Sequence, residues 1–312
     1  MWRGFLVPTS PRAGVADCPM LAQQFLNGLV VGSTYALFAL GFTLMFGVLG
    51  VINLTYGFYF SVGAFLALFA ARDLHLSIWL ALPLSAVGSG LIAVVLDALL
   101  LTPLRRAKAP ELASLMVTLG ATLLLYSLAN AAFGTDIRRF PPSVIDARAM
   151  EVLGIRITQT QILIIGMTVV IVVGLLALMQ GTRIGLGIRA LAEKPDIAAL
   201  MGVNGGALVR LVSFVSGMLG GTTGVLIGLN YNAIQPYMGE VMMLKGFAVI
   251  ILGGLGDIRG ALVAGLVVGM LETLTAGYVA STWKDAVGFA LLVLTLWFRP
   301  SGMFGRAAVK RA

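Results

Sequence analysis

The segment 160–204 reads TQILIIGMTVVIVVGLLALMQGTRIGLGIRALAEKPDIAALMGVN, and it combines two kinds of sequence. Its first part, 160–180, is uncharged and has about the 20 residues that a helix needs to cross the hydrocarbon core of a bilayer. Its second part, 182–204, carries charged residues, glycines and a proline. We therefore predict a membrane-spanning helix that leads into a folded polar loop.

Long apolar runs separated by short polar connections continue along all 312 residues. Hydrophobic residues make up 59% of the chain and charged residues 11%, whereas an ordinary soluble domain has about 25% charged residues. Mean hydropathy is +0.99. The runs lack the alternating pattern of membrane β-barrels, so helices are the expected spanning structure. We predict an all-α integral membrane protein, a polytopic helical bundle of about eight or nine transmembrane helices.

Nine apolar segments are candidate spans, and the connections 51–57 and 256–260 between some of them could instead belong to broken or re-entrant helices. The candidates are 23–48, 56–71, 77–101, 112–133, 160–180, 207–230, 241–255, 260–278 and 285–298.

The chain has 39 glycines, more than its loops can use, so many are expected between closely packed helices. Intervals of four residues indicate packing ridges made by Gly220, Gly224 and Gly228 and by Gly265 and Gly269.

Three regions are predicted along the chain. Residues 1–20 contain three prolines and an apolar stretch too short for a signal peptide, so we expect a disordered extension, or translation that starts at Met20. Residues 21–304 form the transmembrane domain, with a cytoplasmic loop at 181–206. Residues 305–312 form a basic cytoplasmic tail.

The charge distribution predicts the orientation. If 102–111, 181–206 and the C-terminal segment are cytoplasmic, that side has twelve basic and four acidic residues, against eight basic and seven acidic outside. The positive-inside rule then places the N-terminus outside and the C-terminus inside, although the outer segment 134–159 carries four arginines and counts against this. The rule also accounts for the net charge of +8 without a nucleic-acid partner.

The loop 182–204 is predicted to hold two short helices. Gly185 and Gly187 are expected to break the preceding span, Pro195 to start the second helix, and Gly202 to end it. Asp196 falls in the first turn of that helix, where the helix dipole favours an anion.

This loop could be an amphipathic helix that rests on lipid headgroups or a surface that docks a protein. Mixed acidic and basic residues suit a protein partner better than an anionic membrane. Apolar residues between them are candidate anchors: Ile188, Leu191, Ile197, Leu200 and Met201.

The loop resembles the cytoplasmic coupling loop of the branched-chain amino acid ABC transporter permeases of the LivH type. The matching positions are Thr182, Arg183, Gly185, Arg189, Ala190, Ala192, Pro195, Ala198, Gly202 and Val203. The family's motifs are also similar to LNGLVVGSTYALFALGFTLMFGVLGVINLTYGFYFSVGAF (26–65), PLRRAKAPELASLMVTLGATLLL (103–125) and ILGGLGDIRGALVAGLVVGMLE (251–272). The resemblance extends from about residue 21 to residue 304.

The resemblance implies an ABC importer permease fold in a bacterial inner membrane. The implied partners are a second permease of related fold (LivM type), two ATP-binding subunits (LivG and LivF types) and a periplasmic substrate-binding protein. It also implies that ATPase coupling involves Arg183, Arg189, Glu193, Asp196 and Gly202.

Candidate residues of the substrate path are Asn53, Thr55, Tyr56 and Glu272. The first three lie in the turn GVINLTYG, which lines a passage if it lies at membrane depth. Where the family has N-F-A-H-G, this chain has Leu54, Thr55 and Tyr56, so the carry-over covers only Asn53 and Gly57. Glu272 is an acid inside a predicted span, with a role in the path or in capping or subunit pairing.

Other polar residues have plainer expectations. Asp97 is expected to pair with Arg105 or to snorkel to the membrane surface, and Lys245 to meet headgroups or water near the end of a span. Asp257 and Arg259 are expected to bridge to one another or to a partner. A single histidine, His75, does not make a metal site or a catalytic group, so neither a metal, a cofactor nor an enzyme activity is predicted.

The chain has no G-x-x-x-x-G-K-[ST] phosphate loop, so the energy of transport must come from separate subunits. We predict the membrane permease subunit of an ABC importer for branched-chain or similar small amino acids. The alternative is a self-sufficient secondary transporter or channel for a small polar solute, which requires its own polar site near the membrane midplane.

Overall fold

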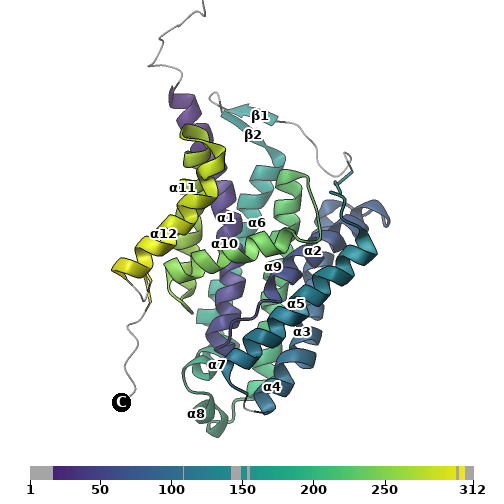
Figure 1. Ribbon diagram of the computed structural model, residues 1–312, viewed down its shortest axis with the longest axis vertical. Helices are drawn as coiled ribbons and strands as arrows, with labels where there is room; N and C mark the ends of the chain where they lie inside the picture. The colour runs from purple at the N-terminus through teal and green to yellow at the C-terminus, as the bar shows by residue number, and fades with distance from the viewer. Residues whose placement is uncertain (1–16, 108, 142–148, 153–154, 300–301, 306–312) are drawn as a thin grey trace, which may run out of the picture.

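The computed structural model describes residues 17–107, 109–141, 149–152, 155–299 and 302–305 (Figure 1). η1 is a π-helix and η2 a 3-10 helix. In chain order the elements are α1 (Asp17–Leu49), α2 (Tyr56–Arg72), α3 (Ile78–Leu96), η1 (Asp97–Leu101), α4 (Thr102–Arg106), α5 (Glu111–Phe133), β1 (Ala149–Val152), β2 (Ile155–Thr158), α6 (Gln159–Gly181), α7 (Arg183–Glu193), α8 (Pro195–Leu200), α9 (Gly205–Tyr231), α10 (Met238–Gly253), α11 (Ile258–Tyr278), η2 (Ser281–Trp283) and α12 (Lys284–Phe298).

The predicted all-α membrane bundle is confirmed, and each of the nine predicted apolar segments is a helix. Within the described ranges six of them are long and apolar enough to cross a membrane: α1, α3 with its continuation to Arg106, α5, α6, α9 and α11. The other three, α2, α10 and α12, have 17, 16 and 15 residues. The predicted eight or nine spans are therefore six full-length and three shorter helices.

A small β-hairpin departs from the all-α prediction. Strands β1 and β2 pair antiparallel, with Ala149 opposite Thr158. The backbone of Arg156 exchanges two hydrogen bonds with the side chain of Gln23, at 2.9 and 3.1 Å. These bonds attach the hairpin to α1.

The centre of the bundle is built on α1 and α9, with α5 and α6 at its edge. In the most apolar stretch of α1, 83% of the residues are buried, whereas in α5 the share is 22%. Helix α6 carries no charged residue, and α1, α5 and α9 carry one each at or near an end, so packing in the centre depends on shape.

The predicted glycine ridges are confirmed as packing contacts. Gly265 and Gly269 of α11 lie against Ala36 and Gly32 of α1, and a Cβ added at Gly269 would lie 2.3 Å from backbone atoms of Gly32. On α9, a Cβ at Gly224 would meet the backbone carbonyl of Phe60 in α2. Helices α1, α2, α9 and α11 can approach closely only because these positions lack side chains.

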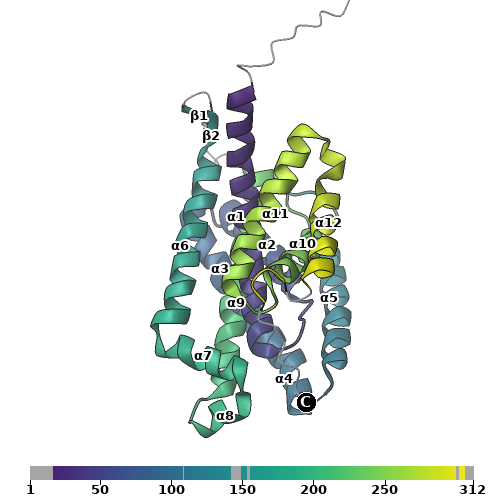
Figure 2. The same ribbon diagram turned by 90° about the vertical axis from the view of Figure 1, so that its left-hand side faces the viewer.

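The two ends of the bundle differ in structure. Helices α4, α7 and α8 gather at one end, whereas the β-hairpin and the turn between α11 and α12 lie at the other (Figures 1 and 2). Helix α10 instead runs across the long axis at mid-height (Figure 1). The two basic loops predicted to be cytoplasmic therefore share one end of the molecule.

The predicted terminal regions are only partly described. Helix α1 begins at Asp17, within the predicted extension, and residues 1–16 lie outside the described ranges, as do 306–312 of the predicted tail. The backbone N–H groups of Met303 and Phe304 donate to the carbonyls of Leu252 and Gly253, at 2.8 and 3.1 Å. The segment 302–305 thus caps the end of α10.

Candidate functional site

The loop after α6 folds as the predicted pair of short helices, α7 and α8. Thr182 is the single residue between α6 and α7. Its hydroxyl donates to the Leu178 carbonyl in the last turn of α6, at 2.7 Å, and accepts from the Gly185 N–H in the first turn of α7, at 3.0 Å. Side-chain caps of this kind favour a new helix start. The span is therefore broken at Thr182, and the prediction that Gly185 and Gly187 break it is wrong.

Gly185 has a different purpose within α7. A Cβ at this position would lie 2.3 Å from the Leu178 carbonyl oxygen, so its absence lets α7 turn tightly against the end of α6. Both glycines are ordinary helical residues of α7.

The predicted ends of α8 are confirmed. Pro195 opens the helix and Asp196 lies in its first turn. Gly202 follows the last turn with φ +83°, a left-handed conformation that glycine adopts without strain.

The helix pair presents charge and apolar surface outward. Its predicted coupling residues are all exposed: Arg183, Arg189, Glu193, Asp196 and Gly202. The predicted apolar anchors divide into two groups. Ile188 and Leu191 are buried against the bundle, whereas Leu200 and Met201 are 86% and 80% exposed. Such exposed apolar residues beside mixed charges are typical of a surface that contacts another protein.

An open cleft of about 1680 Å³ lies beside α7. Arg189 and Glu193 line one wall, and Asp257 and Arg259 from the turn between α10 and α11 line another. The ends of α1 and α6 complete it. Asp257 caps α11 by accepting the Gly260 N–H at 2.9 Å, and within the described ranges it does not form the predicted bridge with Arg259.

Replacing Thr182 with alanine tests the joint between α6 and α7. Loss of this cap is expected to cost about 1 kcal/mol and to speed amide hydrogen exchange in the first turn of α7. The matched control is Thr158→Ala, because Thr158 caps the other end of α6 in the same way. That variant should speed exchange at the start of α6 and leave α7 unchanged. Equal protection of α7 in Thr182→Ala and the native protein would contradict this interpretation.

The predicted turn at 51–57 folds back into the bundle. The ring of Tyr56, the first residue of α2, lies 4.7 Å from that of Phe38 and 5.4 Å from that of Phe42, with distances measured between ring centroids. Phe38 and Phe42 lie about three and two helical turns before the end of α1 at Leu49. Helix α2 therefore starts deep in the bundle, as expected of a broken helix.

The three predicted path residues of this turn are buried and bonded to one another. The side-chain oxygen of Asn53 accepts from the backbone N–H and the hydroxyl of Thr55, at 3.0 and 2.6 Å. The Thr55 hydroxyl also lies 2.9 Å from that of Tyr59, and the Tyr56 hydroxyl donates to the Phe38 carbonyl at 3.0 Å. Each is at most 1% exposed. They form a buried polar network, and none of them lines the open cleft.

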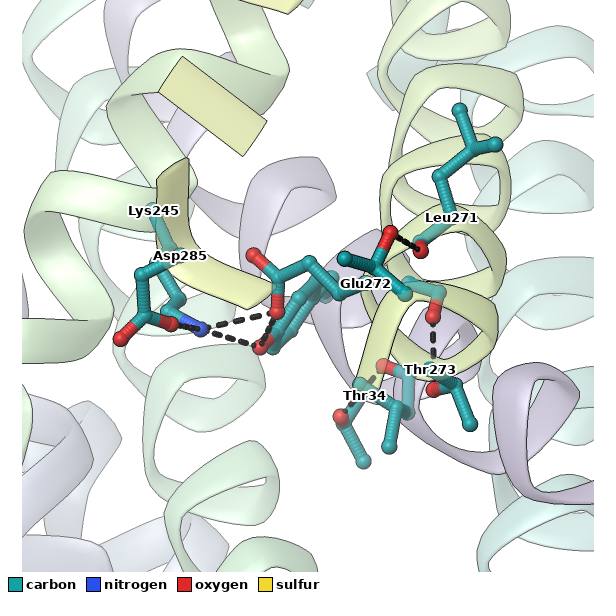
Figure 3. Close-up of polar contacts among 10 residues, drawn as sticks. Thr34, Lys245, Leu271, Glu272, Thr273 and Asp285 are labelled. Atoms are coloured by element: carbon teal, nitrogen blue, oxygen red, sulfur yellow. Dashed lines mark hydrogen bonds and ion pairs between the residues drawn. The ribbon is translucent and has the colours of Figure 1, made fainter. Parts of the chain in front are cut away.

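Glu272 lies in a cluster of four polar side chains from four helices (Figure 3). The ammonium of Lys245 donates to Glu272 and to the Tyr35 hydroxyl, both at 2.8 Å, and to Asp285 at 2.7 Å. Tyr35 donates to Glu272 at 2.7 Å. The cluster joins α1, α10, α11 and α12 with one positive and two negative charges.

The expectation that Lys245 meets headgroups or water is wrong. Its side chain is only 14% exposed because three acceptors surround it. Lys245 and Glu272 are opposite charges within predicted spans, and pairing them satisfies both in a low-dielectric region. The cost of an unpaired charge inside a membrane could therefore have predicted this pair from the sequence.

The predicted pairing of Asp97 with Arg105 is confirmed, at 2.7 Å. Asp97 begins the π-helix η1, which brings its side chain toward the arginine eight residues later. This pair braces the joint between α3 and α4. It lies apart from the cluster at Lys245, on different helices.

The polar groups offer no metal chemistry that we can identify. Across the described ranges, no three side chains of His, Cys, Asp or Glu approach closely enough to hold a metal ion. His75 lies in the turn after α2.

Known proteins resemble this chain over nearly its whole length. Residues 24–296 match the model of a family described as the permease component of branched-chain amino acid transport systems. The permease LivH of Escherichia coli K12, named for high-affinity branched-chain amino acid transport, is 31% identical over 93% of this chain and 97% of its own. BraD of Pseudomonas aeruginosa, named in the same way, is 30% identical over the same shares. A probable LivH of Methanocaldococcus jannaschii is 29% identical over 91% of this chain and 92% of its own.

Proposed function

The chain belongs to the family of branched-chain amino acid transport permeases, and we propose that it is the membrane subunit of an ATP-driven importer for branched-chain or similar small amino acids. The relatives with this name are transport permeases, and the match covers both ends of the helical region. The bacterial inner membrane is the proposed location.

The helix pair α7–α8 is the observation that carries this proposal. It projects from one end of the bundle, is attached to α6 by a single capped residue, and exposes Arg189 and Glu193 beside an open cleft. A rigid joint of this kind can transmit a push from an ATP-binding partner to the spans. We propose Arg183, Asp196 and Gly202 as further members of this contact.

The proposed assembly has separate subunits for energy and for capture. A second permease of LivM type completes the passage, LivG- and LivF-type subunits hydrolyse ATP, and a periplasmic protein delivers the solute. This chain then needs no catalytic group of its own. ATP binding in the partners would move α7 and α8 and rock the spans between outward-open and inward-open states.

We assign two roles to the predicted path residues. The buried network at Asn53, Thr55 and Tyr56 would act as a hinge that keeps the start of α2 in place while the spans move. Glu272 would lie beside the solute, because its cluster reaches the surface through Asp285, which is 51% exposed.

The coupling role can be tested by replacing Arg189 and Glu193 together with alanine. The expected result is at least a tenfold loss of ATP-driven uptake by the complete importer in proteoliposomes, with lower recovery of the ATP-binding subunits on purification. Both effects are expected because two charged contacts with the ATP-binding subunit are removed at once.

A matched control is the double replacement of Glu151 and Arg156. These residues also form an exposed acidic and basic pair, with 2.8 Å between their charged groups, but they lie on the β-hairpin at the opposite end. Recovery of the ATP-binding subunits should then match that of the native protein. Full uptake and full recovery in the Arg189 and Glu193 variant would refute the coupling role.

The cluster at Lys245 also favours a second candidate, a self-sufficient secondary transporter. Ionisable groups at membrane depth are the usual coupling sites of such carriers. The purified chain, reconstituted alone, distinguishes the two. Uptake driven by an ion gradient without ATP-binding subunits would support the carrier, and uptake that requires those subunits and ATP would support the importer.

A further inference from the structure

The cluster of Tyr35, Lys245, Glu272 and Asp285 occupies an unusual place for charged groups. Lys245 belongs to α10, which crosses the bundle at mid-height, and Asp285 belongs to the first turn of α12 (Figures 1 and 3). Glu272 is only 5% exposed, whereas Asp285 is 51% exposed. The cluster thus extends from the protein interior to one face of the bundle.

The hydrogen bonds of the cluster divide it into a fixed part and an open part. All three N–H groups of Lys245 are used, and Tyr35 both accepts from Lys245 and donates to Glu272. Asp285 contacts the cluster through one carboxylate oxygen, and its other oxygen has no hydrogen bond or ion pair with described residues. The bond between Lys245 and Asp285 is therefore the one that can open without disturbing the rest.

Opening that bond alone would leave Asp285 without a counter-ion, at a cost in free energy, whereas Lys245 would keep Glu272 as its partner. A zwitterionic amino acid removes this cost. Its carboxylate can take the third N–H of Lys245, and its ammonium group can take Asp285. Every charge then remains paired, and the total charge of the cluster does not change.

The surfaces around the open part are apolar. Val241 lies four residues before Lys245 on α10 and is 59% exposed, and Phe289 lies four residues after Asp285 on α12 and is 44% exposed. Residues four apart share one face of a helix. An aliphatic side chain attached to the zwitterion therefore has apolar neighbours on both sides.

We propose that this cluster is a binding station for the amino-acid cargo, in which the α-carboxylate pairs with Lys245 and the α-ammonium pairs with Asp285. Tyr35 and Glu272 hold Lys245 in position. The inference rests on the proposed transport of small amino acids and adds the groups that recognise the main-chain atoms of the cargo. It predicts that both charged groups of the cargo are required.

Binding can be measured on the complete importer in lipid nanodiscs without its periplasmic binding protein, so that bound solute reports on the membrane subunits. Saturation-transfer NMR detects weak ligands, and the probes are L-leucine, L-leucinamide and 4-methylpentanoic acid. The amide lacks the carboxylate and the acid lacks the ammonium group. We expect L-leucine to bind at least fivefold more tightly than either analogue.

The decisive variants change Asp285. Asp285→Asn should weaken L-leucine binding at least tenfold, whereas Asp285→Glu should stay within about threefold because it keeps the carboxylate. Asp73→Asn is the control, since Asp73 is an exposed acid in the turn after α2. This variant should bind L-leucine as tightly as the native protein does. Thermal unfolding of each complex checks that the half-exposed Asp285 can be changed without loss of the fold.

The outcomes separate the station from the transport function. The station is refuted if the native complex does not bind L-leucine, if either analogue binds as tightly as L-leucine, or if Asp285→Asn leaves binding unchanged. ATP-driven uptake of L-leucine with the binding protein present is measured in parallel. Uptake that persists after the station is refuted leaves the transport function in place, and absence of uptake of any branched-chain amino acid removes both.

Discussion

Replacing Gly269 with leucine is expected to abolish accumulation of the folded protein in the membrane. A Cβ at this position would lie 2.3 Å from the Cα and N atoms of Gly32, which are backbone atoms that no change of rotamer can move. Even overpacking that side chains can relieve costs about 1–3 kcal/mol, so a clash between two helix backbones should cost more. The measurement is the fraction of detergent-extracted protein that elutes as a single sharp peak.

A control with the same change of volume is Gly174→Leu. Gly174 lies in α6, and a Cβ added there meets no atom of the described structure within 4 Å. Leucine also favours the helix over glycine by about 1 kcal/mol, so this variant should accumulate at least as well as the native protein. Similar yields for the two variants would mean that α1 and α11 are not packed as the structure has them.

The helices could be predicted from sequence because each is long and apolar, and lipid allows few alternatives to a helix. Their arrangement could not be predicted in the same way. Helices such as α6 are apolar on all sides, so no periodic pattern shows which face points inward. The glycine ridges were the exception, since an interval of four residues marks a face directly.

The helix pair α7–α8 was predictable in outline because its signals are local. Pro195 and Gly202 act within one turn of the helix that they start or end. The glycines at 185 and 187 predict the wrong position for the break, because the hydroxyl of Thr182 decides the end of α6. The division of the anchors into buried and exposed groups depends on how α7 packs, which is not a local property.

The polar interior was the least predictable part. Asn53 and Thr55 are only two residues apart in sequence, and their hydrogen bonds follow the usual geometry of an Asn turn. Lys245 and Glu272 are 27 residues apart on different helices, so their contact depends on the crossing of α10 over the bundle. Only the cost of isolated charge in a membrane pointed to the pair.

A few packed helices link the helix pair α7–α8 to the polar interior at Asn53 and Lys245. Helix α7 contacts α1 and both helices line the cleft, and α1 carries Tyr35 of the proposed binding station and Phe38 beside the start of α2. A displacement of α7 that tilts α1 would therefore reach both the hinge at Asn53 and the cluster at Lys245. This connection gives the proposed coupling a physical route through contacts in the chain.

Replacing Lys245 with methionine is expected to cause the largest loss of stability after the change at Gly269. Methionine keeps much of the length and volume of the lysine but leaves Glu272, which is 5% exposed, beside Asp285 without a cation. Removing one partner of a buried ion pair costs about 3–5 kcal/mol, because an uncompensated charge stays behind. Thermal unfolding of the purified importer complex should show a clear drop in the midpoint.

The double variant Lys245→Met with Glu272→Gln separates lost charge pairing from lost packing. It removes both deeply placed charges, and a neutral amide can still accept the hydrogen bond of Tyr35, so most of the stability should return. Glu272→Gln alone should be milder than Lys245→Met, since Lys245 keeps Asp285 as its counter-ion. Equal unfolding midpoints for Lys245→Met and the double variant would show that the lysine stabilises the bundle by its volume, and the charge argument for the cluster would then be wrong.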